Sequence, residues 1–146
     1  MSDLTNYAEN KIIDALLRGQ SIGTPATWYI ALLTAAGTPE TGSVTECAGT
    51  GYARVGVTAG TANWSGTQSA GSTTASSGTG GRSSNNATID FGTAGGSNWG
   101  TITHVAFYDA SSSGNAWIVK ALTASKTINS GDPVTFPADA LGVTLA

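Results

Sequence analysis

The sequence predicts a mainly β protein: an antiparallel β-sandwich of the jelly-roll type with one N-terminal helix. Two observations support this fold class. Short apolar or alternating segments recur at fairly regular spacing, and turns rich in Gly, Pro, Ser or Asn separate them. Many short strands divided by turns are typical of sandwiches and barrels, so a β-barrel is the alternative. With 146 residues the chain has the size of one domain, and we expect residues 1–146 to form a single structural domain.

The first element is a helix, predicted over residues 2–19. Ser2 or Asp3 is the expected N-cap, and Gly19 stands where a C-terminal stop belongs. Apolar residues recur every three or four positions, as on one face of a helix. That face consists of Leu4, Ala8, Ile12, Ala15 and Leu16. We expect it to pack on the sheet of the same subunit, with packing on a neighbouring subunit as the alternative.

About eight short strands are expected after the helix. Residues 27–34 are apolar on both faces, as in a strand buried on both sides. Residues 35–50 are rich in Gly and Pro and are expected to be turns, and the Ser-Ser-Ser-Gly run at 111–114 predicts a hairpin turn. The other expected strands are 52–58, 87–91, 101–109, 115–122, 126–128, 133–136 and 141–145, with 62–64 as a short addition.

Residues 65–86 differ from the rest of the chain. Sixteen of these 22 positions are Gly, Ser or Thr. Such a segment buries too little apolar surface to offset the entropy lost on ordering it. We predict a flexible loop or an arm that becomes ordered against a partner.

The composition favours a protein that works within an assembly. Charged residues make up only 10% of the chain, compared with about 25% in a typical soluble domain. Ser, Thr, Asn and 20 glycines take their place, and small neutral side chains solubilise a surface weakly. We therefore expect neighbouring subunits to cover much of the surface.

Charge and hydropathy argue against two classes of partner. The net charge is −3 with six Lys and Arg residues, too few to neutralise a row of phosphates, so we predict no direct nucleic-acid binding. No apolar run is long enough for a transmembrane helix, and the N-terminus lacks the basic and apolar regions of a secretory signal. We expect synthesis in a cytoplasm and no membrane partner.

No group of residues predicts catalysis. His104, the only histidine, lies in an alternating segment, where a packed or half-exposed strand residue is expected; Cys47, the only cysteine, is expected to be a partly buried thiol. Asp109 and Asp132 flank predicted turns, where Asp usually binds its own backbone. A carboxylate pair for glycan hydrolysis is the alternative, but a chain of this size has little room for a long glycan groove. We predict that the protein is not an enzyme and assign no catalytic, cofactor-binding or metal-binding residue.

The four tryptophans divide into two pairs. Trp28 and Trp117 lie within apolar runs and are expected in the core. Trp64 and Trp99 lie beside Gly- and Ser-rich loops, which makes them the better candidates for contact with a ligand or partner. The alternative is that they close the ends of the sandwich.

Several blocks of the sequence, in order, resemble a family of small phage and prophage proteins. The resemblance spans nearly the whole chain, but residues 65–84 match no motif of the family. The blocks are LTNYAENKIIDALLRG (4–19), PATWYIALLT (25–34), GYAR (51–54), ANW (62–64), SNNA (84–87), WGTITHVAFYDA (99–110) and KTINSGD (126–132).

This resemblance implies a structural protein of the phage particle. Members are often described as tail-fibre-like, and the family is also similar to jelly-roll cement proteins that sit as trimers on phage heads and carry no catalytic residues. We favour a capsid cement (decoration) protein because fibre-type repeats are absent. Its partners would be the major capsid protein and copies of itself, as a homotrimer. A tail or tail-fibre component is the alternative. The expected location is the virion, after synthesis in the cytoplasm of the bacterial host.

Overall fold

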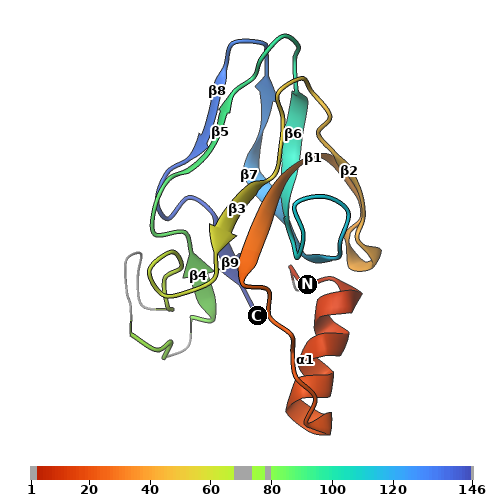
Figure 1. Ribbon diagram of the computed structural model, residues 1–146, viewed down its shortest axis with the longest axis vertical. Coiled ribbons are helices and arrows are strands. Elements are labelled where there is room, and N and C mark those ends of the chain that lie inside the picture. Colours follow the sequence, from red (N-terminus) through yellow and green to blue (C-terminus); the bar gives the residue numbers. More distant parts are fainter. Residues whose placement is uncertain (1–2, 68–73, 78–79, 146) are drawn as a thin grey trace.

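A five-stranded antiparallel sheet is the main layer of the computed structural model, which describes residues 3–67, 74–77 and 80–145 (Figure 1). Its strands follow the order β2-β1-β6-β7, and β3 pairs with β1 on the same edge as β2. The strands are β1 (Thr27–Thr38), β2 (Ser43–Glu46), β3 (Val55–Thr58), β6 (Gly100–Tyr108) and β7 (Ala116–Ile128).

The central strand β1 is apolar on both faces because both faces are covered. Ile30 and Leu32 point to one side of the sheet, Ala31 and Leu33 point to the other, and all four are almost fully buried. One edge of β1 pairs with β6, while β3 and β2 pair in turn along the other edge. The prediction of a doubly buried strand at 27–34 is confirmed, although the strand is longer than predicted.

Two short strand pairs form a second layer over one face of this sheet. β5 (Ile89–Thr93) pairs with β8 (Pro133–Phe136), and β4 (Arg82–Ser84) pairs with β9 (Gly142–Thr144), both antiparallel. One buried cluster joins the layers, including Ile30, Leu32, Val105 and Phe107 from the sheet and Ile89, Phe91, Val134 and Leu141 from the second layer. The prediction of a mainly β, antiparallel fold with one helix is confirmed, and the jelly-roll connectivity stays a prediction.

The helix α1 (Asn6–Arg18) begins later than predicted, and its N-cap is Thr5 rather than Ser2 or Asp3. The hydroxyl of Thr5 accepts a hydrogen bond from the backbone N–H at the third helical position. The preceding segment instead pairs with the edge of β7 through two backbone hydrogen bonds of 2.9 Å. Because the sheet uses these backbone groups, the helix begins only after them. Gly19 is the C-cap, as predicted, with φ of 64°.

Only the first half of α1 packs against the sheet. Ala8 is buried, and the ring of Tyr7 meets Trp117 edge-on with 5.3 Å between centroids. Leu16, by contrast, is 76% exposed. In Figure 1 the helix extends past the ends of the strands. The predicted buried face is therefore wrong at Leu16, because the described strands end short of the last turns of the helix.

Three further predictions about the strands are corrected by the structure. Residues 35–50 are not only turns: β1 and β2 form a hairpin there, joined by a short 3₁₀ helix, η1 (Pro39–Thr41). The segments 115–122 and 126–128 belong to one long strand, β7, whose pairing with β6 is interrupted by register shifts. Residues 62–64 contribute an isolated bridge rather than a strand.

The ends of the Gly/Ser/Thr-rich segment 65–86 belong to the folded structure. β4 lies within it, and the buried hydroxyls of Ser65 and Ser84 are 3.0 Å apart and hydrogen bonded. These local polar contacts compensate for the lack of apolar side chains. The central part of the predicted loop or arm, at 68–73 and 78–79, lies outside the described residues.

Candidate interaction surface

An apolar groove of about 610 Å³ lies between α1 and the neighbouring ends of the strands. Aromatic contacts build its floor. Trp28 stands edge-on between Phe107 and Trp117, with ring centroids 6.5 and 5.4 Å away, and Trp64 is tilted against Phe107 at 5.5 Å. Interlocked rings of this kind hold the groove in a fixed shape. Its apolar lining residues include Ile12, Trp28, Trp64, Phe107, Trp117 and Leu145.

Beside the groove, three large apolar side chains of α1 project into solvent. Ile13, Leu16 and Leu17 are 52%, 76% and 81% exposed. Residues three and four positions apart share one side of a helix, so these three form a continuous stripe, which we call the ridge. Single exposed apolar residues are ordinary on protein surfaces, and a contiguous stripe next to an apolar groove is a candidate interaction surface.

The two tryptophans that were candidates for partner contact lie in different environments. Trp64 lines the groove, and its Nε1 is buried without a hydrogen-bond partner among the described residues. Trp99 lies in the core, where Nε1 donates to the carbonyl of Thr50 at 2.9 Å. Trp64 therefore belongs to the candidate surface, whereas Trp99 fixes a loop from within.

One charged residue, Arg82, is found among the groove-lining residues that the structure describes. Its guanidinium pairs with the carboxylate of Asp139 at 2.7 Å, with both side chains largely exposed. Hydrogen bonds from Ser84 and Arg82 hold the pKa of Asp139 below its ordinary value. The mainly apolar groove therefore has an Arg82–Asp139 ion pair at its edge.

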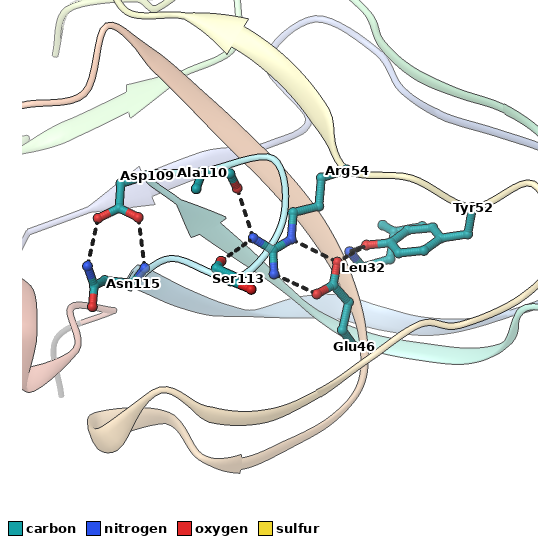
Figure 2. Close-up of polar contacts among 8 residues, drawn as sticks. All are labelled: Leu32, Glu46, Tyr52, Arg54, Asp109, Ala110, Ser113 and Asn115. Atoms are coloured by element: carbon teal, nitrogen blue, oxygen red, sulfur yellow. Dashed lines mark hydrogen bonds and ion pairs between the residues drawn. The ribbon is translucent and has the colours of Figure 1, made fainter.

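A second polar cluster, centred on Arg54, lies where β2 and β3 follow one another along the same edge of β1 (Figure 2). Its Nε and Nη2 donate to the two carboxylate oxygens of Glu46 at 2.9 and 2.8 Å. Nη1 donates to the carbonyls of Ala110 and Ser113 at 2.9 and 2.8 Å. The guanidinium also stacks on Tyr108, 3.6 Å from the ring centroid. Arg54 thus ties the end of β2 to the β6–β7 hairpin turn.

Tyr52 completes this cluster. Its hydroxyl donates to Glu46 at 2.8 Å and accepts from the backbone N–H of Leu32 at 2.9 Å. Burial is the main reason that the pKa of Tyr52 is raised well above its ordinary value. Every polar group here has a partner, which is typical of a structural brace rather than of a site awaiting a substrate. The sequence patterns did not predict this brace; the one local signal for it is an arginine placed just before the alternating apolar segment of β3.

The remaining candidate groups for chemistry are engaged in local structure. Asp109 accepts hydrogen bonds from the backbone and side chain of Asn115 at 2.7 and 2.9 Å, and Asp132 accepts one from the backbone of Asn129 at 2.9 Å. These contacts confirm the prediction that both aspartates organise turns. His104 is half-buried in β6 with Nδ1 2.8 Å from the hydroxyl of the preceding threonine.

The described ranges are also informative about metal and membrane binding. They contain no group of three or more His, Cys, Asp or Glu side chains arranged to hold a metal ion. Likewise, none of the helices in the described part is both long and apolar enough to cross a membrane.

A family model described as "Podophage GP4 fiber I protein gp80" matches residues 3–144. The chain belongs to this podophage fibre family. The match includes the ridge, the Arg54 brace and all of the groove except Leu145, so nearly the whole candidate surface lies within the shared domain. No curated protein matches the chain. Membership confirms the resemblance to phage particle proteins with a tail-fibre-like description, and it identifies the chain as a phage structural protein.

Proposed function

We propose that this member of the podophage fibre family is a structural subunit of the phage tail or tail fibre. The description of the matching family supports this assignment over our first preference, a capsid cement protein. The ridge and groove support a role in which the subunit is held by its neighbours, because they expose apolar surface that an isolated protein gains nothing by exposing.

We also propose that the protein is not an enzyme. The groove is lined mainly by apolar side chains, and the carboxylates of Glu46, Asp109 and Asp132 are used by the brace or by turns. A general acid or base requires a polar group free to exchange a proton with a substrate. We therefore propose that the protein acts by binding its neighbours, and that it needs no cofactor.

A capsid cement protein remains the second candidate, and one observation favours it. The described chain is a short β domain with one thirteen-residue helix, without the repeats or long coiled coil of a fibre shaft. In this alternative the partners are the major capsid protein and copies of the chain itself, arranged as a homotrimer, and many weak contacts hold the shell together.

The location on the particle distinguishes the two candidates. We would purify particles, count copies of the chain by quantitative mass spectrometry against the major capsid protein, and image particles labelled with a gold-conjugated antibody. A fibre subunit predicts label at the tail and a few dozen copies or fewer. Label distributed over the head, with hundreds of copies, would refute the fibre assignment in favour of the cement protein. Absence of the chain from purified particles would refute both.

A further inference from the structure

We propose that the segment Asp3–Thr5 is a strap that masks the edge of β7 over residues 116–120, and that this edge pairs with the same edge of a second copy once the strap is released. The inference concerns what keeps copies of the chain apart. It goes beyond the proposed function and does not depend on whether the chain serves on the tail or on the head.

The strap is a short edge segment, paired antiparallel with the first half of β7, the outermost strand on that side of the main sheet. The backbone N–H of Thr5 donates to the carbonyl of Trp117 at 2.9 Å. The N–H of Val119 donates to the carbonyl of Asp3, also at 2.9 Å. The strap therefore occupies the main-chain groups that this part of β7 directs away from the sheet.

The two halves of β7 are protected against strand pairing in different ways. An exposed edge strand is a template for pairing with another chain, and bulges and lysines are common protections. Residues 121–127 have both, because the register with β6 shifts there and Lys126 is exposed among Ser and Thr side chains. Residues 116–119 read Ala-Trp-Ile-Val, a sequence without charge that mostly favours strands. Among the described residues, it is the strap that covers this half.

The masked edge is complementary to itself. Leu4 of the strap lies opposite Ile118, and the two main-chain hydrogen bonds lie on either side of this pair. In an antiparallel pairing of two copies with Ile118 opposite Ile118, the N–H of Val119 in each copy meets the carbonyl of Trp117 in the other. Both main-chain hydrogen bonds of the strap are thus reproduced about a twofold axis, with the same patch used by each copy. This self-complementarity favours a second copy as the partner.

Charge does not oppose this pairing. In the twofold register Lys120 of each copy lies opposite Ala116 of the other, so the two lysines are about 14 Å apart along the strands. That separation exceeds the screening length of about 8 Å at physiological ionic strength. Like charges directly opposite one another would be destabilising, and this register avoids them.

Side-chain contacts that a second copy of β7 does not supply keep the strap in place. The carboxylate of Asp3 lies 2.9 Å from the ammonium of Lys120, and both side chains are partly buried. The buried hydroxyl of Thr5 donates to the carbonyl of Ala116 at 2.7 Å. Because the main-chain hydrogen bonds are equivalent in the two states, these side chains of the strap decide between the masked edge and the paired edge.

The strap and α1 can leave the edge of β7 together. The last turns of α1 expose Leu16 and Leu17 and so add little to its attachment. In the part of the chain that the structure describes, the hydrogen bonds of the connecting residues 20–25 run only to residues 14–23. The connection between α1 and β1 is therefore not tied to the sheet by hydrogen bonds, and it permits α1 to move away.

The test traps the paired edge with a disulfide in the full-length chain. Opposite residues of a non-hydrogen-bonded antiparallel pair lie about 4.5 Å apart at Cα, so the sulfurs introduced by Ile118→Cys in two copies are within reach of one another. Ala121→Cys, at an exposed position of the same strand, is the matched control. In the twofold register its two copies are about 20 Å apart, too far for a disulfide. Cys47 is buried and does not compete.

Each cysteine substitution is made in the native chain and in a release variant, Asp3→Lys with Thr5→Val, which removes both side-chain contacts of the strap. A restoring variant adds Lys120→Asp to the release variant and re-forms the ion pair with its charges reversed. Association is measured by sedimentation velocity, and cross-linking by non-reducing electrophoresis after mild oxidation. Circular dichroism reports whether each variant is folded.

We expect the release variant to associate more strongly than the native chain, and the restoring variant to reverse part of this change, by roughly fivefold in Kd. Ile118→Cys should cross-link two copies of the release variant, whereas Ala121→Cys should not. A folded release variant that associates no more than the native chain, or equal cross-linking at the two positions, would overturn the proposal. Equally fast cross-linking of Ile118→Cys in the native chain would also overturn it, because the strap would then mask nothing.

A second variant decides the matter if the release variant is unfolded. Asp3→Lys alone changes a partly exposed ion pair and leaves the hydroxyl of Thr5 in place. With Ile118→Cys it should cross-link roughly fivefold faster than the native chain, because oxidation traps even a small fraction of open strap. An unchanged rate would overturn the proposal.

Discussion

Replacing Arg54 by methionine tests whether the brace stabilises the fold. Met keeps an unbranched apolar stem but removes four hydrogen bonds, two to Glu46 and two to the hairpin carbonyls of Ala110 and Ser113. The arginine side chain is only 7% exposed. Breaking a buried ion pair typically costs 3–5 kcal/mol, and because Glu46 retains some access to water we expect a loss of about 3 kcal/mol. For a chain of this size that corresponds to a decrease in Tm of roughly 6–12 °C.

Urea unfolding followed by tryptophan fluorescence measures this loss. Arg18→Met is the matched control, because it removes an exposed ion pair in which Arg18 lies 2.9 Å from the carboxylate of Asp14. Exposed ion pairs of this kind contribute about 0.5 kcal/mol or less. Arg54→Lys keeps the charge but not the planar fork, which contacts Glu46 and the hairpin together, so we expect it to recover less than half of the loss.

A double-mutant cycle with Glu46→Gln separates the pair from the rest of the brace. If the two side chains stabilise one another, the double variant should lose about 1.5 kcal/mol less than the sum of the single variants. An Arg54→Met variant within about 0.5 kcal/mol of the native chain would refute the reasoning, because that is the effect of an ordinary surface substitution. Additive losses would show that the hairpin carbonyls, and not Glu46, account for the effect.

Three further predictions concern single sites. Gly49→Ala should cost about 2 kcal/mol in urea unfolding because its Cβ would overlap the indole of Trp99. Gly95→Ala, whose Cβ would come no nearer than 4.0 Å to the carbonyl oxygen of Thr93, should be near neutral, and equal effects would contradict the argument. Partial burial tends to raise the pKa of Asp109, but hydrogen bonds from Asn115 and Trp117 lower it. The stabilisation of the fold by the Asp109 carboxylate should therefore be present above the ordinary aspartate pKa and be lost as the pH falls through the folded-state pKa. The stability difference between the native chain and Asp109→Asn should therefore shrink on acidification, and a difference independent of pH would contradict this account. Burial raises the pKa of the Cys47 thiol, so Ellman's reagent should react with it only after unfolding; rapid labelling of the folded chain would contradict its buried position.

The parts of the fold that were predicted correctly are those in which local pattern and environment agree. The strand at 133–136 and the hairpin turn at 111–114 occur as expected, because alternation and turn residues act within a few positions of one another. The hairpin 35–46 was missed because its glycines and proline resemble those of a loop. Its strands are held by pairing along β1, and that pairing is not visible in the local sequence.

The candidate surface was predictable only in part, for a related reason. The periodicity of α1 shows which residues share a side, but Leu16 and Ala8 look equivalent in such a pattern although one is exposed and the other buried. The difference depends on where the strands end, which is a property of the assembled sheet. The groove likewise combines α1 with the ends of five strands, so no local motif predicts it.

An amphipathic pattern therefore indicates that one face of a helix needs a packing partner, but it does not predict which surface that partner is. In this chain the sheet covers the first half of α1 and leaves the second half exposed, even though the sequence remains apolar through Leu17. If the isolated domain were the functional unit, polar residues at the ridge would improve solubility without cost to the fold. The ridge is thus best explained by a partner surface.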